Sequence, residues 1–350
     1  MASQAKLEPL DSPQRYTVAW IAALPYELAA AAAMLDVEHD KPANFRQSPH
    51  DPNAYTWGSI GKHHVVITSL PDGVYGTTAA GSTANQLLSS LPHIRFGLMV
   101  GIGAGVTQPE GIDVRLGDVV VGKPHGSSGG VIQHDLVKNK GETSTTGHLN
   151  KPPLVLLHAL SKLRAQHLRK GSIVPFVLKD MLEKNPLMGS KSTKDPGFTH
   201  PGAKSDRLFA PWRQHVGSAD CGKCPEADTI SRDRRHTTDP EIHYGVIASG
   251  NALVKNANER DEILRRLPEN VRNECLCIEM EAAGLMDTFP CIVIRGICDY
   301  ADSHKNDMWQ KYAAATAAAF AKEFLSFVDV QEVDRAPELH KVVEKGPSIQ

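Results

Sequence analysis

Several acidic residues lie within or just after apolar segments, where an unpaired carboxylate is costly. Glu27 follows the apolar run 17–24, Glu279 and Glu281 lie within the segment 277–284 (CIEMEAAG), and Asp299 comes just after the run 291–297. Carboxylates in such surroundings need a partner or a ligand. They can accept hydrogen bonds from hydroxyl groups, or transfer a proton when burial shifts their pKa.

Each of these residues also has an ordinary structural interpretation. Asp299 can cap the following helix as well as serve as a general acid. Glu279 and Glu281 can open a solvated helix, in which case their side chains point in different directions. Arg295 lies inside the apolar run, where a charged residue needs a buried partner. The residue types alone leave these alternatives open.

The segment Gly101-Ile102-Gly103-Ala-Gly105 follows an apolar run, and its glycines would let the backbone approach a ligand closely. The dinucleotide-binding pattern is not met, because Val106 stands where the third glycine belongs. The same glycines are equally typical of a tight turn between a strand and a helix.

A second small pattern is Cys221-x-x-Cys224, preceded by His215. A single pair of this kind, without a second pair, is a weak zinc signal. The sequence favours a plain or redox-labile thiol pair here, and we expect neither a metal nor an organic cofactor.

The composition excludes several classes of protein. The chain has 350 residues, of which 41% are hydrophobic and 22% charged, and its formal net charge is −2. This is ordinary globular composition without a basic run, so neither nucleic acid nor a membrane surface is expected as a partner. No apolar run approaches the ~18 residues of a membrane span, and the polar beginning lacks a signal-peptide core. Four cysteines in apolar surroundings indicate a reducing compartment, and we expect a cytoplasmic location; they are Cys275, Cys277, Cys291 and Cys298.

Strand-like and helix-like segments alternate along the chain, which predicts an α/β fold with a largely parallel sheet. Apolar runs predict strands over residues 17–24, 62–70, 96–100, 118–122, 242–249 and 291–297. Helices are predicted over residues 25–36, 77–91, 152–168, 259–266 and 307–328. Ligands of such sheets bind at the carboxyl ends of the strands, where Glu27, Gly101 and Asp299 are expected.

The chain divides into a main domain and three less regular parts. Residues 16–328 form one predicted domain, interrupted at about 171–240 by a polar, weakly periodic insertion. Long segments of this kind within compact domains are usually functional or disordered. Residues 1–15 and 329–350 are predicted to be a flexible lead and a flexible tail.

Taken in order, the motifs resemble the purine and uridine phosphorylase family. The segments are ALPYELAA, VGIGAGV, GDVVVG, ASGNALV, IEMEAAG and IRGICDYAD. The resemblance is strongest to the nucleosidase branch, which includes the methylthioadenosine/S-adenosylhomocysteine nucleosidases, and to fungal members with a long central insertion. It implies a single α/β domain, flanked by helices, around a mixed and partly barrel-like sheet. It also implies a homodimer that cleaves the N-glycosidic bond of a purine nucleoside.

The resemblance further implies a role for each matching residue. Asp299 would donate a proton toward purine N7, Glu27 would position and activate water, and Arg295 would lie near the nucleophile. The substrate-binding positions would be Leu253, Val254 and Asn251 beside the base, Met280, Glu281 and Glu279 beside the ribose, and Gly101, Ile102 and Gly103 in the glycine segment.

Hydrolysis is favoured over phosphorolysis because the expected phosphate-binding arginines are missing. Family phosphorylases carry an arginine after the first strand and another two residues before the glycine segment, where this chain has ALPYELAA and Met99. Arginines of the insertion (Arg213, Arg232, Arg234 or Arg235) could replace them, which keeps a phosphorylase as the alternative. A non-catalytic nucleoside-binding module is the other alternative. Adenosine, inosine and guanosine all remain candidate substrates.

Overall fold

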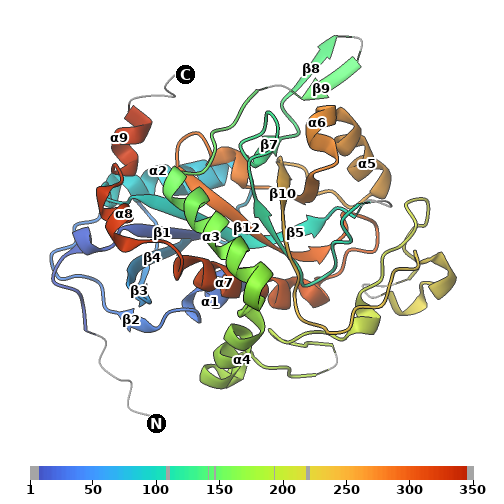
Figure 1. The fold of residues 1–350 in the computed structure, drawn as a ribbon, viewed down its shortest axis with the longest axis horizontal. Coiled ribbons are helices and arrows are strands. Elements are labelled where there is room, and N and C mark those ends of the chain that lie inside the picture. Colours follow the sequence, from blue (N-terminus) through green and yellow to red (C-terminus); the bar gives the residue numbers. More distant parts are fainter. Residues whose placement is uncertain are drawn as a thin grey trace.

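The computed structural model describes residues 8–107, 111–140, 142–145, 147–192, 194–217 and 221–344. Within them, ten strands form one mixed sheet (Figure 1). Its order is β11 (Cys275–Glu279), β10 (Ile242–Ser249), β6 (Val119–Gly122), β12 (Cys291–Asp299), β5 (Phe96–Gly105), β1 (Val18–Ala22), β4 (His63–Ser69), β3 (Thr56–Ile60) and β2 (Val37–His39), with β7 (Val131–Gln133) beside β10. A separate hairpin pairs β8 (Val137–Lys140) with β9 (Glu142–Thr145).

Part of this sheet closes on itself. Strand β11 runs parallel to β10 on one side and pairs antiparallel with the end of β5 on the other. Strands β5, β12, β6, β10 and β11 therefore form a ring, while β1 to β4 extend it as an open sheet. Antiparallel pairs such as β12 with β6 make the sheet mixed. This confirms the single α/β fold with a partly barrel-like sheet.

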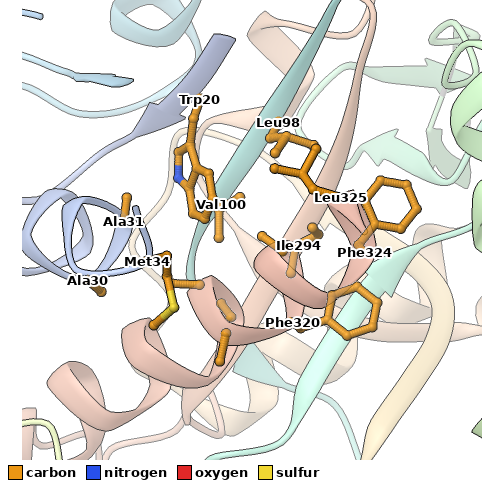
Figure 2. Close-up of a cluster of buried hydrophobic side chains, with 14 of the residues drawn as sticks. Trp20, Ala30, Ala31, Met34, Leu98, Val100, Ile294, Phe320, Phe324 and Leu325 are labelled. Atoms are coloured by element: carbon orange, nitrogen blue, oxygen red, sulfur yellow. The ribbon is translucent and has the colours of Figure 1, made fainter. Parts of the chain in front are cut away.

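The helices are α1 (Pro25–Ala32), α2 (Thr77–Ser90), α3 (Leu154–Lys170), α4 (Val174–Lys184), α5 (Ala257–Arg266), α6 (Glu269–Arg272), α7 (Gln310–Leu325), α8 (Val330–Arg335) and α9 (Leu339–Glu344). Helix α7 is the central core helix, because 13 of its 16 residues are buried. It lies close to β12 at Gly296, which has no side chain: a Cβ there would stand 1.8 Å from the carbonyl oxygen of Ala313 in α7. Figure 2 shows Phe320, Phe324 and Leu325 of α7 packed with side chains of α1, β1, β5 and β12.

Two local predictions are wrong. The glycine segment does not turn after a strand but continues β5 to Gly105, because β12 and β11 both supply pairing partners there. The glycines allow β5 and β11 to lie this close together, because a Cβ on Gly103 would lie 2.5 Å from the Cys277 sulfur. Glu279 ends strand β11 rather than opening a helix.

The insertion and the tail are more ordered than the sequence indicates. In the insertion, α4 packs on α7, and Phe198, Leu208 and Phe209 are buried. Figure 1 shows α4 in yellow-green at the lower edge of the view, and the later part of the insertion in yellow at the side of the molecule opposite α8 and α9. The tail residues 330–344 form α8 and α9, with Val333 and Leu339 buried, so the expectation of a flexible tail is wrong there. Residues 13–15 of the predicted lead form a short 3-10 turn; residues 1–7 lie outside the described part. No helix of the described residues is both long and apolar enough to span a membrane.

Candidate active site

A cavity of about 420 Å³ opens where β1, β5, β11 and β12 end. It is lined by the four carboxylates that the sequence singled out, Glu27, Glu279, Glu281 and Asp299. All four are at least nine-tenths buried. The remaining predicted positions on its wall are Ile102, Gly103, Leu253, Val254 and Met280. Residues from four separate strand ends therefore meet in one place, as expected for a sheet of this kind.

Glu27 is fixed by three backbone N–H groups. It occupies the first turn of α1, which Pro25 begins. Its Oε2 accepts hydrogen bonds from the N–H groups of Ala23 (2.7 Å) and Leu24 (3.0 Å), and its Oε1 accepts one from Ile102 (2.7 Å). Burial raises the pKa of Glu27 against the lowering effect of Arg295 and these donors. A carboxyl group of raised pKa beside a cavity is suited to accept a proton.

Arg295 lies behind the carboxylates rather than in the cavity wall. Its side chain is fully buried in β12, where Nη2 donates to Glu279 Oε2 and, at 3.4 Å, to Glu281 Oε2. Its Nη1 donates to the carbonyl of Ile102 at 3.3 Å. Gly101 lets the side chains of Arg295 and Glu27 lie side by side, because a Cβ at this position would stand 2.5 Å from each of them. Arg295 thus places one positive charge against Glu279, Glu281 and Glu27, and Gly101 gives it room without itself lining the cavity.

Glu281 has the most accessible carboxyl group of the Arg295 cluster, although it is 93% buried. Besides the contact with Arg295, its Oε1 accepts a long hydrogen bond (3.4 Å) from the Gly76 N–H. Burial raises its pKa to about 7; Arg295 opposes this rise, and Glu279 and Glu27 add to it. The Glu279 carboxylate, in contrast, is occupied by contacts within the protein. Besides pairing with Arg295, it accepts hydrogen bonds from the N–H groups of Glu281 and Ala282.

Asp299 is the last residue of β12 and lines the cavity. Its Oδ1 accepts a hydrogen bond from the Ala301 N–H (2.8 Å). Its Oδ2 is approached by the Cys298 thiol (3.2 Å) and by the ammonium group of Lys305. The backbone of Ala301 has φ = 53°, a left-handed conformation that is uncommon for alanine. Asp299 therefore acts neither as the N-cap of a following α-helix nor as an exposed acid.

Asn251 does not face the cavity. Its side-chain oxygen accepts hydrogen bonds from the backbone and hydroxyl of Thr77, and its amide nitrogen donates to Asp135. It ties the start of α2 to the loop after β10. The next residues along the chain, Leu253 and Val254, do line the cavity.

The sequence did not indicate several residues of the cavity wall, among them Tyr26, Tyr75 and Lys305. Tyr26 directly precedes Glu27, so an aromatic beside a candidate catalytic acid was a usable signal. Lys305 follows Asp299 by six residues in the loop after the strand. Its role depends on the path of that loop, which no local pattern encodes.

The arginines of the insertion do not reach this cavity. Arg213 pairs with Asp228, Arg232 with Asp206, and Arg235 with Asp118. A larger cavity of about 1190 Å³ lies among these residues, and Arg234 is part of its wall. The smaller cavity is the candidate active site, because its carboxylates converge on one space and form no ion pairs with the insertion among the described residues.

The fold is that of known nucleosidases. The structure of 5′-methylthioadenosine/S-adenosylhomocysteine nucleosidase from Neisseria meningitidis matches 89% of this chain and 98% of its own, with a TM-score of 0.54 and 16% identity. Futalosine hydrolase of Helicobacter pylori matches 90% of this chain and 99% of its own, with a TM-score of 0.53 and 14% identity. At these identities the likeness concerns the fold.

Two proteins are similar in sequence over parts of their length. A "nucleotide-binding leucine-rich repeat (NLR)-like protein" of Hyaloscypha variabilis is 43% identical over 324 residues, which are 92% of this chain and 30% of that protein. The "ATP nucleosidase Cap17" of Escherichia coli is 32% identical over 89 residues, which are 24% of this chain and 17% of that protein. The chain thus spans less than a third of the length of the relatives it matches. No family model matches the sequence.

Proposed function

We propose that the chain hydrolyses the N-glycosidic bond of a purine nucleoside, giving the free base and ribose. The observation that carries the proposal is the convergence of Glu27, Glu281 and Asp299 from separate strand ends on one cavity of about 420 Å³. Small-molecule sites have volumes of about 300–1,000 Å³, so the cavity suits a nucleoside. The nucleosidase fold and the local similarity to an ATP nucleosidase support the same class of reaction.

Each carboxylate has a distinct task in this reaction. As the C1′–N9 bond breaks, the base takes the bonding electron pair and a proton from Asp299 moves to its N7. Glu281 accepts hydrogen bonds from ribose hydroxyls and stabilises the positive charge that develops on the sugar. Glu27 receives a proton from the water whose oxygen bonds to C1′. Leu253, Val254 and Met280 supply apolar contact for the base and sugar.

Water rather than phosphate is proposed as the nucleophile. Phosphate sites commonly use arginine forks, and no described residue lining the cavity is an arginine. Arg295 is fully buried and shared between Glu279 and Glu281. The lysines of the wall are Lys305, which is paired with Asp299, and Lys255, which is exposed at the rim.

Product analysis of adenosine, inosine and guanosine, with and without phosphate, tests the proposal. Free ribose released at equal rates in both conditions supports hydrolysis. Ribose-1-phosphate formed only in phosphate replaces hydrolysis by phosphorolysis. Failure to release base from these nucleosides, from 5′-methylthioadenosine and from ATP would leave the nucleoside-binding module as the better account.

ATP is the second substrate we propose to test, since one relative is named an ATP nucleosidase. Lys255 at the cavity rim offers a positive charge to a substrate extended by phosphates at the 5′ position. Release of adenine from ATP at a higher kcat/KM than from adenosine, and loss of that preference in Lys255→Met, would assign the nucleotide as the substrate. The exposed Lys62→Met variant is the matched control.

A further inference from the structure

Two cysteines and two histidines outside the cavity lie together where the insertion meets the loop after β12. The ligand atoms of His215, Cys224 and His304 all lie within 4.8 Å of one another. The Cys221 sulfur belongs to the same cluster, because it lies 3.8 Å from His215 Nδ1 and 3.5 Å from the His304 carbonyl oxygen. Residues more than eighty positions apart in the sequence are thus brought together.

Two of the distances between these atoms fit the edges of a tetrahedral metal site. With Zn–S of about 2.3 Å and Zn–N of about 2.0–2.1 Å, a sulfur and a nitrogen on one zinc ion stand about 3.6 Å apart. The distances from His215 Nδ1 to the sulfurs of Cys224 and Cys221 are 3.4 and 3.8 Å. These two contacts therefore need no rearrangement of the chain to become edges of a coordination tetrahedron.

His304 is held in place by ring stacking, while its Nδ1 makes no hydrogen bond within the described part of the chain. Its ring is stacked on Phe209 at a centroid distance of 3.6 Å, and the residue is 6% exposed. Among the described residues its Nδ1 has no hydrogen-bond partner; the Asp302 carboxylate, at 3.7 Å, is beyond hydrogen-bonding range. Leaving a buried polar nitrogen unpaired is costly, which suggests that the ring serves a ligand.

The cysteine pair is also built into a fixed turn. The Cys224 N–H donates to the Cys221 carbonyl at 3.1 Å. The Arg207 guanidinium donates to both cysteine carbonyls, at 2.9 and 2.7 Å. This turn directs both sulfurs toward His215 and places a positive charge close to thiols that would be deprotonated on metal binding.

We propose that Cys221, Cys224, His215 and His304 bind one zinc ion. Two thiolates and two imidazoles in tetrahedral arrangement are the usual ligands of structural zinc and do not suit magnesium or calcium. Binding releases the two thiol protons to solvent and forms two Zn–S and two Zn–N bonds. Four protein ligands leave no open coordination position, so the metal is structural rather than catalytic.

Such a site fastens the insertion to the loop that completes the active site. His304 precedes Lys305, which contacts Asp299. The His215 N–H donates to the Ser303 hydroxyl (3.0 Å), giving the same two segments a second link. The metal would therefore hold residues 299–305 in place from outside the cavity.

Metal analysis of the untagged full chain, purified under reducing conditions without chelator, tests this. We expect about one zinc ion per chain by mass spectrometry. The double variant C221S/C224S and the single variant His215→Gln should each retain less than about a tenth of it. The matched control is His236→Gln, an exposed histidine of the same insertion, which should keep the full content.

A second measurement does not depend on whether the variants fold. Cobalt(II) added to the chelator-treated wild-type chain should give thiolate charge-transfer and tetrahedral d–d absorption bands, and zinc should displace both. Absence of these bands together with a zinc-free protein would overturn the proposal, as would a Cys221–Cys224 disulfide that persists under these reducing conditions. Full zinc content in the folded double variant would also overturn it, by placing the metal elsewhere.

Discussion

Asp299 is the residue on which base release should depend most directly. Its Oδ1 is engaged by the Ala301 N–H, while Oδ2 lies beside Lys305 and Cys298 at the cavity wall. Asparagine keeps the shape but cannot supply a proton, so Asp299→Asn should lower kcat by about 10²–10⁴-fold. The assay is base release from the preferred nucleoside, with the exposed Asp334→Asn on α8 as the control. Wild-type kcat in Asp299→Asn would remove this residue from the proton-transfer step.

Glu281 should set the acid limb of the pH profile. Burial raises its pKa from the ordinary value of 4.5 to about 7. Its ionised form is present above that pH, and only this form accepts hydrogen bonds from ribose hydroxyls through both oxygens. We therefore expect kcat/KM to fall about tenfold per unit as the pH drops below this pKa. In Glu281→Gln the activity should be low and this limb absent; a wild-type profile flat from about pH 5 to 8 would contradict the assignment.

Strand β12 depends on Arg295 for charge balance within the sheet. The guanidinium is 0% exposed and faces Glu279, Glu281 and Glu27. Arg295→Met would leave buried carboxylates unpaired, which typically costs about 3–5 kcal/mol of unfolding free energy. Urea unfolding measures this loss. The exposed Arg335→Met, which removes one surface ion pair to Glu332, should change stability by less than about 1 kcal/mol.

The pH dependence of this loss gives an independent check. Without Arg295, the buried carboxylates bind protons more readily in the folded state than in the unfolded chain. Their destabilising effect is then present at high pH and relieved as protons bind at low pH. The difference between Arg295→Met and wild type should therefore be smaller at about pH 5 than at about pH 8. An equal loss at both values would indicate a packing defect instead.

The local sequence pattern predicts the elements that are themselves uniformly apolar or whose partners lie nearby in the chain. Strands β1, β4, β10 and β12 are apolar runs, and the sequence predicts all of them. Strand β11 was not predicted because CLCIE is only five residues long and becomes a strand by pairing with both β10 and β5. The continuation of β5 through Gly105 has the same cause, because neighbouring strands overrode the local preference of glycine for a turn.

The residues of the candidate site show the same difference between local and long-range signals. The sequence indicated Glu27, Glu281 and Asp299 because a carboxylate in or beside an apolar run needs a partner or a ligand. All three line the cavity. Asn251 was expected beside the base but bridges Thr77 and Asp135 instead. Its partners are more than a hundred residues away in the sequence, so no local signal could reveal that use.

At the scale of the whole molecule, the insertion is an integral part of the domain. Its residues contact the loop after β12 through the hydrogen bonds of Tyr300 with Asp206 and Arg232, through ring stacking of Phe209 on His304 and through the proposed zinc site. Its α4 packs on α7. The sequence predicts an insertion at about 171–240 because this segment is polar and weakly periodic. It does not reveal that Arg235 pairs with the buried Asp118, or that Asp206 and Arg232 bind the Tyr300 hydroxyl. The homodimer implied by family resemblance remains a prediction for solution measurement.

Tyr300 provides the clearest test that the insertion supports the active site. It follows Asp299 directly, and its hydroxyl donates to Asp206 and accepts from Arg232 (2.8 Å), both in the insertion. Tyr300→Phe removes these two contacts while leaving the Asp206–Arg232 ion pair, so we expect a loss of about 1–3 kcal/mol. The insertion should also be cleaved faster in limited proteolysis, and kcat should fall although no cavity-lining side chain has changed. Tyr244→Phe, which loses one hydroxyl contact to His167 of α3, should lose stability without either effect. Unchanged proteolysis and kcat in Tyr300→Phe would mean that the insertion covers the domain without positioning the loop that follows Asp299.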